Sequence, residues 1–331
     1  MIRVGLVGLG MAVTPHANSL VDLKGRVEVA YACSPSAERR KKFAERFPFP
    51  QCDRLETLLE DRGVDAVAVL TPPSTHLAIV ERCARAGKHV LLEKPLEITT
   101  RRAEELVQKA SSHGVILAAV LQNRHKPATK RLVEALAAGE LGRLASASAF
   151  VDLWRPQSYY DQPGRGTRAR DGGGVLLTQG IHTLDVLLAL AGEPLEVKSF
   201  STTTPVHRME TEDLVCAAVK WQSGALGVVW ATTSAYPGTP ERIEIVAERG
   251  TATLVGTKAE MRWHDGRTES AGEEGTAGGA GADPMAFPHD YHRAVWSDFL
   301  DAVERRRPPL VSGAEALKVH RFIDRILQSG G

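Results

Sequence analysis

The chain has 331 residues, 43% of them hydrophobic and 24% charged, and a formal net charge of +1. This length and composition predict one large or two smaller globular domains with a packed core. The balanced charge excludes a strongly basic nucleic-acid binder, and no uninterrupted apolar run reaches the roughly 18 residues that cross a membrane.

The four cysteines, at positions 33, 52, 83 and 216, lie far apart and show no C-x-x-C spacing. Neither a disulfide framework nor a zinc site is expected, and no other metal site is indicated. The first apolar run starts at Ile2, which leaves no room for a signal peptide. We therefore expect a cytoplasmic protein with reduced thiols.

Residues 1–121 alternate between short β-rich runs and helix-like runs. The β-rich runs are too continuously apolar to have one wet face, which is typical of parallel strands buried on both sides. This alternation predicts a doubly wound parallel sheet, as in a dinucleotide-binding Rossmann domain. The expected strands are 2–7, 27–33, 64–70, 89–93 and 115–121, and the expected helices are 12–23, 36–46, 55–61, 74–86 and 99–112.

The pattern changes over residues 122–331, where strands follow one another without intervening helices. This predicts a second α/β domain with a mostly antiparallel sheet. A Gly-, Ala- and Glu-rich segment at 266–284 is expected to be a surface loop. The expected strands are 143–153, 195–204, 213–221, 225–234, 241–247 and 250–255, and the expected helices are 126–138, 175–191, 288–305 and 313–328.

The sequence GLVGLGMAVTPH separates the first strand from the first helix. Gly8 and Gly10 match the first two glycines of G-x-G-x-x-G, which allow the tight turn and let the backbone approach a pyrophosphate. Val13 replaces the third glycine, so it should loosen the packing of the helix on the strand without weakening the binding of a dinucleotide. The alternative is an ordinary strand-to-helix turn. The candidate contacts to a dinucleotide are Gly8, Gly10, Met11 and Ala12.

The end of the second strand has no acid at the position that usually holds the adenosine ribose diol. Ser34 stands there, and Arg39 and Arg40 follow. Without a carboxylate to repel a 2′-phosphate, a serine with nearby arginines is compatible with NADP. The alternative is that both arginines point to solvent. The expected cofactor is NAD(P), with a preference for NADP.

Two further strand ends carry distinctive turns, and such sheets bind ligands beyond the carboxyl ends of their strands. The turn LTPPSTH contains two prolines, which also suit a purely structural role. The turn EKP places Lys94 at the mouth of a buried strand, where it can donate to a substrate hydroxyl or assist proton transfer. The candidate cofactor contacts are Thr71, Pro72, His76, Glu93, Lys94 and, further along the chain, Asn123.

The apolar helix expected at 175–191 carries Thr178, His182 and Asp185 at spacings i, i+4 and i+7. On a continuous α-helix these side chains form one narrow polar stripe, which indicates a cavity or a ligand. His182 is a candidate general base for proton transfer from an alcohol. The alternative is a core histidine paired with Asp185.

The loop at 154–171 concentrates aromatic and arginine side chains. Aromatic rings stack on sugars, and arginines recognise carboxylate or phosphate. The alternative is a disordered basic loop. The candidate substrate contacts are Arg124, Trp154, Arg155, Tyr159, Tyr160, Arg165, Arg168 and Gln179.

In this order and spacing, the motifs resemble those of the Gfo/Idh/MocA family of nicotinamide-dependent oxidoreductases. The resemblance spans nearly the whole chain and is carried by GLVGLG, TPPSTH, EKP, QNRHKPA, the YYDQPGRGT to DGGGVLLTQGIHTLD block and HRMETED. It implies a Rossmann domain followed by an α/β domain with a large open sheet. It also implies a homodimer or homotetramer formed through that sheet.

The resemblance further implies that Lys94 and His182 are the active-site pair. Many members carry Asp or Asn four residues before the histidine, where this chain has Thr178. Thr178 can hydrogen-bond a substrate but cannot act as a base near neutral pH. Gln179 is a possible polar substitute, and Asp185 is expected to orient His182.

The sequence thus predicts an NAD(P)-dependent oxidoreductase that moves hydride between nicotinamide and the hydroxyl or carbonyl carbon of a sugar, polyol or related cyclic alcohol. Three alternatives stay open. They are a UDP-sugar oxidase, a glycosidase that keeps NAD bound and a non-catalytic NAD(P)-binding regulator. The substrate and the physiological direction cannot be read from the sequence.

Overall fold

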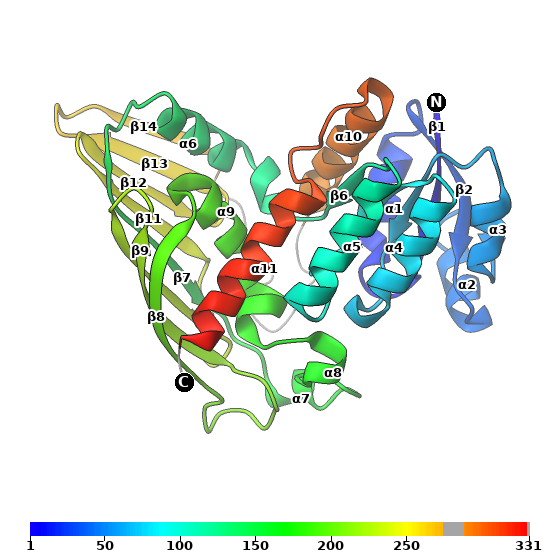
Figure 1. Cartoon of the computed structure of the whole chain (residues 1–331), viewed down its shortest axis with the longest axis horizontal. Helices are drawn as coiled ribbons and strands as arrows, with labels where there is room; N and C mark the ends of the chain where they lie inside the picture. The colour runs from blue at the N-terminus through cyan, green and yellow to red at the C-terminus, as the bar shows by residue number, and fades with distance from the viewer. Residues whose placement is uncertain (274–287, 330–331) are drawn as a thin grey trace. The chain divides into compact units, whose positions relative to one another are not determined.

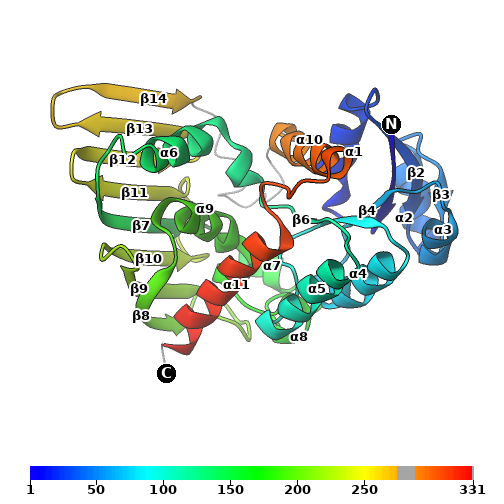
Figure 2. The same cartoon turned by 45° about the horizontal axis from the view of Figure 1, so that its top comes forward.

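The computed structural model describes residues 1–273 and 288–329, which divide into two compact units. The first unit contains Met1–Gln122 together with Pro288–Leu317, and the second contains the remaining described residues. Figures 1 and 2 show the helices and strands of both units.

The first unit is built on a six-stranded parallel sheet with strand order β3-β2-β1-β4-β5-β6. This is the doubly wound order, in which the chain reverses direction across the sheet beside β1. The central strands are buried on both faces, which explains their continuous apolar sequences. The strands are β1 (Ile2–Val7), β2 (Val27–Cys33), β3 (Gln51–Cys52), β4 (Ala66–Val69), β5 (His89–Leu92) and β6 (Leu117–Ala119).

Helices connect these strands and begin close to the predicted positions. Ser36 and Thr99 cap two of them, since their side-chain oxygens accept hydrogen bonds from the N–H groups of Arg39 and Arg102. The helices are α1 (Val13–Asp22), α2 (Ala37–Ala44), α3 (Leu55–Glu60), α4 (His76–Arg85) and α5 (Thr100–Ser112), with a 3-10 turn at Pro73–Thr75.

Helix α10 (Asp290–Arg305) belongs to the first unit, although the sequence assigned all of 122–331 to the second domain. Its apolar face, which includes Trp296 and Phe299, joins the core that α1 also lines. Arg26 reinforces the contact with a hydrogen bond of 2.6 Å to Asp301. The sequence shows that α10 is amphipathic but not which unit covers its apolar face.

The second unit is built on an eight-stranded sheet with strand order β14-β13-β12-β11-β7-β10-β9-β8. Only β7 and β10 pair in parallel among the described strands, and the other neighbours are antiparallel. The predicted fold class is therefore confirmed. The strands are β7 (Leu144–Asp152), β8 (Pro194–Thr202), β9 (Leu214–Trp221), β10 (Leu226–Thr232), β11 (Arg242–Ala247), β12 (Gly250–Val255), β13 (Lys258–Trp263) and β14 (Thr268–Gly272).

Helices cover one face of this sheet, and the strands alternate between buried and exposed side chains. The packing includes Trp221 on β9, whose ring centroid lies 5.8 Å from that of Phe322. The helices are α6 (Pro127–Ala137), α7 (Gln157–Tyr160), α8 (Arg168–Asp171), α9 (Ile181–Ala191) and α11 (Gly313–Gln328), which starts in the first unit; a 3-10 turn at Gln122–His125 precedes α6.

Two strands at one edge of this sheet, β13 and β14, were not predicted from the sequence. In β13 every second residue is buried, but the charged residues between them hide that alternation. Part of the predicted surface loop, Thr268–Gly272, is instead the edge strand β14, which the guanidinium of Arg131 holds with two hydrogen bonds to Glu269. Residues 274–284 of that loop lie outside the described residues.

The predicted continuous helix at 175–191 is also corrected. Leu176–Gly180 forms a π-helical turn, and regular α-helix begins at Ile181. A Cβ at position 180 would lie 3.3 Å from the carbonyl oxygen of Val175, so glycine suits this wider turn.

Among the described residues, the stretch Arg168–Ala191 is long and apolar enough to cross a membrane by length and composition, which the sequence reading did not detect. Its scattered polar residues interrupt every apolar run. In the structure 83% of its apolar window is buried inside the protein, as in a core helix.

Candidate active site

The glycine turn after β1 uses its two glycines for different reasons. Gly8 has a φ of +103°, and a Cβ there would lie 2.8 Å from the carbonyl group of Leu70, so the fold itself requires glycine. At Gly10, by contrast, no heavy atom of the described residues lies within 4 Å of where a Cβ would stand. The fold does not explain Gly10, whereas close approach of a ligand does.

The start of α1 is suited to an anion. Ala12 stands at the N-cap and has no side-chain oxygen to accept a hydrogen bond from the first N–H groups. The first turn carries no acidic residue and contains Pro15, as expected. Val13 is buried in the core, and Met11 is 58% exposed beside the turn. A pyrophosphate fits this chemistry.

At the end of β2, Arg40 and not Arg39 folds against the strand. Its Nη1 donates a hydrogen bond of 2.5 Å to the carbonyl oxygen of Ser34. The Arg39 side chain is exposed, and its backbone N–H donates to the N-cap Ser36. Ser34 itself is buried, and its hydroxyl accepts from the Ser36 N–H.

The two predicted turns of the first unit are tied together by His76, which is fully buried at the start of α4. Its Nε2 lies 2.8 Å from the carbonyl oxygen of Thr71, and its Nδ1 lies 3.1 Å from the carbonyl oxygens of Pro95 and Leu96. Burial lowers the pKa of His76. The nearby turn is closed by the hydroxyls of Thr71 and Thr75, 2.7 Å apart, and Pro72 between them is exposed.

Glu97 forms a second anchor for the turn that carries Lys94. Its carboxylate is fully buried and accepts hydrogen bonds from the backbone N–H groups of Leu77 and Ile98. Arg102 donates a further hydrogen bond of 2.7 Å. Lys94 is half-buried directly beyond β5, and the Lys94–Pro95 peptide is cis.

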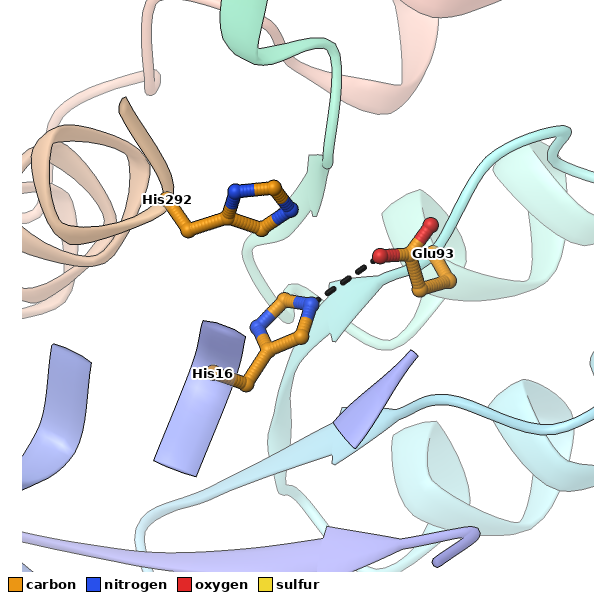
Figure 3. Close-up of side chains that lie close together, drawn as sticks. All are labelled: His16, Glu93 and His292. Atoms are coloured by element: carbon orange, nitrogen blue, oxygen red, sulfur yellow. Dashed lines mark hydrogen bonds and ion pairs between the residues drawn. The ribbon is translucent and has the colours of Figure 1, made fainter. Parts of the chain in front are cut away.

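Glu93 anchors the other side of this turn, as Figure 3 shows. One carboxylate oxygen lies 3.0 Å from Nε2 of His16 on α1, and the other accepts a hydrogen bond of 2.9 Å from the Lys94 N–H. Burial would raise the pKa of Glu93, but the hydrogen bond from His16 and nearby positive charge outweigh it and hold that pKa at about 2. His292 on α10 lies beside this pair. The sequence did not point to His16 or His292.

In the second unit, His182 lies half-buried near the start of α9. Asp185, one turn further, receives Arg124, whose Nη1 lies 3.3 Å from the carboxylate. Thr178 lies in the π-helical turn, and its single hydroxyl hydrogen has two available acceptors, the Gly174 carbonyl oxygen at 2.7 Å and the side-chain oxygen of Gln179. The α-helical spacing behind the predicted polar stripe therefore holds only between His182 and Asp185.

Glu212 caps the helical segment that leads to His182, a role that the sequence did not reveal. Its carboxylate accepts hydrogen bonds from the N–H groups of Gly174 and Leu176, at 3.0 and 3.4 Å. A Cβ at Gly174 would lie 1.7 Å from the Glu212 carbonyl oxygen, which explains a glycine in the DGGG run. Burial raises the pKa of Glu212.

The loop at 154–171 is ordered and includes α7 and α8. Arg155 is 3% exposed and donates to the Trp154 carbonyl oxygen, and the buried Tyr160 bonds the Thr233 hydroxyl at 2.8 Å. Arg165 stacks over the ring of Tyr159, 4.6 Å from its centroid, and donates to its hydroxyl. Trp154 is half-buried and Arg168 is exposed.

His207 and Asp213, both fully buried, hold this loop against the sheet. His207 Nδ1 lies 2.6 Å from the Asp213 carboxylate, and its Nε2 lies 2.8 Å from the carbonyl oxygen of Arg155. Both ring nitrogens face an oxygen atom, so the ring is fixed between the two partners. The HRMETED motif thus serves to position the loop.

Asn123 lines a small cavity of about 20 Å³ in the second unit, which has room for a single water molecule. Half-buried Lys126, whose pKa is lowered by desolvation, donates there to the Gly256 carbonyl oxygen at 3.0 Å. This cavity is too small for a sugar.

Two family models match the chain. The model described as an oxidoreductase family with an NAD-binding Rossmann fold covers residues 2–121, and the GFO/IDH/MocA C-terminal domain covers residues 129–253. These matches confirm the resemblance read from the motifs.

Individual proteins show the same likeness. A 1,5-anhydro-D-fructose reductase of Ensifer adhaerens is 33% identical over 68% of this chain and 68% of its own. A myo-inositol 2-dehydrogenase of Thermotoga maritima is 29% identical over 75% and 74%. The crystal structure of the WlbA dehydrogenase from Bordetella pertussis, in complex with NADH and UDP-GlcNAcA, superposes with a TM-score of 0.84 at 26% identity, covering 99% of this chain and 96% of that one.

The two glycines of the turn are expected to respond differently to a larger side chain. Gly10→Val should leave the melting temperature unchanged but weaken NADH and NADPH binding at least about tenfold, because the valine fills the space left for the phosphates. Gly8→Val should lower the melting temperature by about 5 °C or more, because its backbone conformation and Leu70 exclude a side chain. Fluorescence titration and thermal unfolding measure the two effects.

Gly25→Val is the matched control, since Gly25 also faces open space but lies away from the turn. It should change neither quantity. If Gly10→Val folds and binds NADH and NADPH as tightly as the wild type, no cofactor approaches this backbone.

Proposed function

We propose, from the premise that the chain belongs to the Gfo/Idh/MocA family of oxidoreductases, that it is an NAD(P)-dependent dehydrogenase or reductase of a sugar, polyol or related cyclic alcohol. The observation that carries the proposal is the position of the Lys94 turn, which hydrogen bonds hold beyond the carboxyl end of β5. In the same sheet, the turn after β1 leaves space at Gly10 for a dinucleotide. The reductase and inositol dehydrogenase relatives support the substrate class.

The first unit provides the residues that would hold the cofactor. Gly8, Gly10, Met11 and Ala12 would hold the pyrophosphate through their backbone, and the turns that contain Thr71, Pro72 and Glu93 follow the carboxyl ends of strands in the same sheet. When bound, the nicotinamide supplies or accepts the hydride. His76 would hold the Thr71 turn and the Lys94 turn together, and Asn123 stays a candidate contact to the cofactor.

Lys94 and His182 divide the remaining chemistry. The Lys94 ammonium orients the substrate oxygen and stabilises the negative charge that develops on it. His182 exchanges the hydroxyl proton, because an imidazole titrates near neutral pH. Arg124 pairs with Asp185 at 3.3 Å, and Asp185 would orient His182 from one turn further along α9.

Two of the loop arginines favour a small sugar or polyol over a sugar nucleotide. Arg155 is buried and Arg165 is stacked on Tyr159, whereas Arg168 is exposed. A nucleoside diphosphate needs available cations, whereas Trp154, Tyr159 and Gln179 provide stacking and neutral hydrogen bonds for hydroxyl groups.

Replacement of the two catalytic candidates tests the mechanism. Lys94→Ala and His182→Ala should each lower kcat at least about a hundredfold, a typical loss for general acid–base groups. The exposed Lys41 and His264 provide the controls Lys41→Ala and His264→Ala, which should keep wild-type turnover. The measurement is absorbance at 340 nm in a screen of sugars, polyols and sugar nucleotides with NAD and NADP.

Each alternative function has its own outcome in that screen. Turnover of UDP-sugars alone would identify a sugar-nucleotide oxidase. Glycosidic cleavage without net change at 340 nm would identify a glycosidase with bound NAD. A regulator would bind the cofactor without turning over any substrate, and Lys94→Ala and His182→Ala would leave that binding unaffected.

We further propose that the cofactor is NADP in preference to NAD, since Ser34 replaces the usual acid and Arg40 lies against it. Ser34→Asp should raise the Kd of NADP at least about tenfold, or 1.4 kcal/mol, by placing a carboxylate against the 2′-phosphate. Arg40→Ala should weaken NADP selectively, whereas Arg39→Ala, which removes an exposed side chain, should have a smaller effect. Wild-type protein that binds NAD more tightly than NADP would contradict this preference.

The uncovered face of the second sheet supports a homodimer or homotetramer. Phe200 is 82% exposed and pairs in register with Cys216, which pairs with Trp230 on the next strand. Exposed Leu226 and Val228 extend this apolar surface along β10. A surface of this kind is typical of a contact between copies of the chain.

Charges on that surface should separate the subunits. Phe200→Glu combined with Val228→Glu should convert the oligomer to monomer in light scattering and sedimentation, because burying two carboxylates is costly. Val21→Glu, at an exposed position on α1, is the control and should leave the mass unchanged. A wild-type monomer would contradict the proposal.

We also propose that the protein works in the cytoplasm. All four cysteines are free thiols, and Cys33 and Cys83 are buried. Free buried thiols are compatible with a reducing compartment.

A further inference from the structure

The surroundings of Glu93 contain a buried polar chain that the proposed mechanism does not use. His16 on α1 and Trp296 on α10 are both fully buried, and the Glu93 side chain is only 12% exposed. The indole Nε1 of Trp296 lies 3.1 Å from Nδ1 of His16, and Nε2 of His16 lies 3.0 Å from the Glu93 carboxylate. Three elements distant in sequence thus contribute to one hydrogen-bonded chain that ends at the Glu93 carboxylate, and Figure 3 shows its His16–Glu93 part.

The direction of these hydrogen bonds follows from the donors. An indole N–H can only donate, so Nδ1 of His16 must accept. The hydrogen of the neutral imidazole then resides on Nε2, which donates to Glu93. Trp296 therefore selects the tautomer of His16 that is able to hold the carboxylate.

The second carboxylate oxygen of Glu93 accepts the backbone N–H of Lys94 at 2.9 Å. One oxygen thus fixes the carboxylate to α1, and the other fixes the main chain of the residue that bears the ammonium group. A displacement of the carboxylate is passed directly to Lys94. Errors of about 1 Å in the placement of a reacting group can cost about a hundredfold in rate.

A metal ion is the competing explanation, since potential ligand atoms of His16, Glu93 and His292 all lie within 4.8 Å of one another. A histidine that binds a metal through one nitrogen usually donates a hydrogen bond from the other. Here Nδ1 of His16 accepts from Trp296, so Nε2 keeps its hydrogen and has no lone pair for a metal. The hydrogen-bond pattern favours a relay over a metal site.

We propose that His16 and Trp296 are positioning residues for Lys94, acting through the Glu93 carboxylate. This inference rests on the proposed function for its catalytic consequence, but the hydrogen-bond relay itself does not. The two parts are therefore measured separately, by hydrogen exchange of the Lys94 amide and by steady-state kinetics.

His16→Leu removes the donor to Glu93, whereas His16→Gln retains an N–H at the position of Nε2. The leucine variant should speed exchange of the Lys94 amide about tenfold, because its acceptor is no longer held. It should also lower kcat about tenfold with KM changed less than about threefold. The glutamine variant should restore both quantities toward wild type.

Trp296→Phe is the second variant, and it keeps an aromatic ring in the core while releasing the tautomer of His16. It should speed exchange of the Lys94 amide about threefold and lower kcat about threefold. This variant keeps the test decisive if His16→Leu does not fold. A purely structural role would lower the melting temperature in all three variants without changing the kcat of the folded protein, and that result would overturn the proposal.

Three other outcomes separate the parts. Unchanged exchange of the Lys94 amide in a folded His16→Leu or Trp296→Phe variant would overturn the relay. Saturable Zn²⁺ binding by calorimetry that is lost in His292→Gln would overturn it in favour of a metal site. Full activity of Lys94→Ala, with faster amide exchange in His16→Leu, would support the relay and refute the proposed function.

Discussion

The fixed position of the Lys94 turn is the constraint on which the rest of the first unit depends. Glu93 before the lysine is bonded to His16 on α1. The residues after it are bonded to α4, through His76 to Pro95 and through Glu97 to Leu77. A flexible lysine can serve as a point charge of defined position only if its backbone is held in this way. The parallel sheet and its helices provide the anchors.

In the second unit, different groups hold the candidate site residues in place. Glu212 caps the segment that leads to His182, and the buried His207–Asp213 pair holds the carbonyl group of Arg155. The His207–Asp213 pair is fully buried, so it cannot meet a substrate. Buried polar groups are costly unless they are hydrogen-bonded, so the presence of this pair points to precise placement of the loop and not to added stability.

The sequence predicted the sheets well because burial on one or both faces of a strand is a local pattern. Prediction from the sequence failed where an element is held by a residue that is distant along the chain. β14 has no apolar face and depends on Arg131, more than 130 residues away. The docking of α10 against α1 and the bond from Trp296 to His16 depend on contacts across about 280 residues. Lys94 and His182 could be predicted as site residues because their motifs are local, whereas the residues that hold them in place could not.

The structure also separates candidate residues by whether the fold accounts for them. Gly8 is required by its φ and by Leu70, and Tyr160 and His76 are fully engaged with neighbouring backbone or hydroxyl groups. Gly10 has no such reason to be glycine. Residues that the fold leaves unexplained are those whose identity a ligand must explain. By this criterion Gly10 is the strongest functional candidate in the first unit, whereas the case for Lys94 rests on its motif and on the hydrogen bonds that fix the backbone around it.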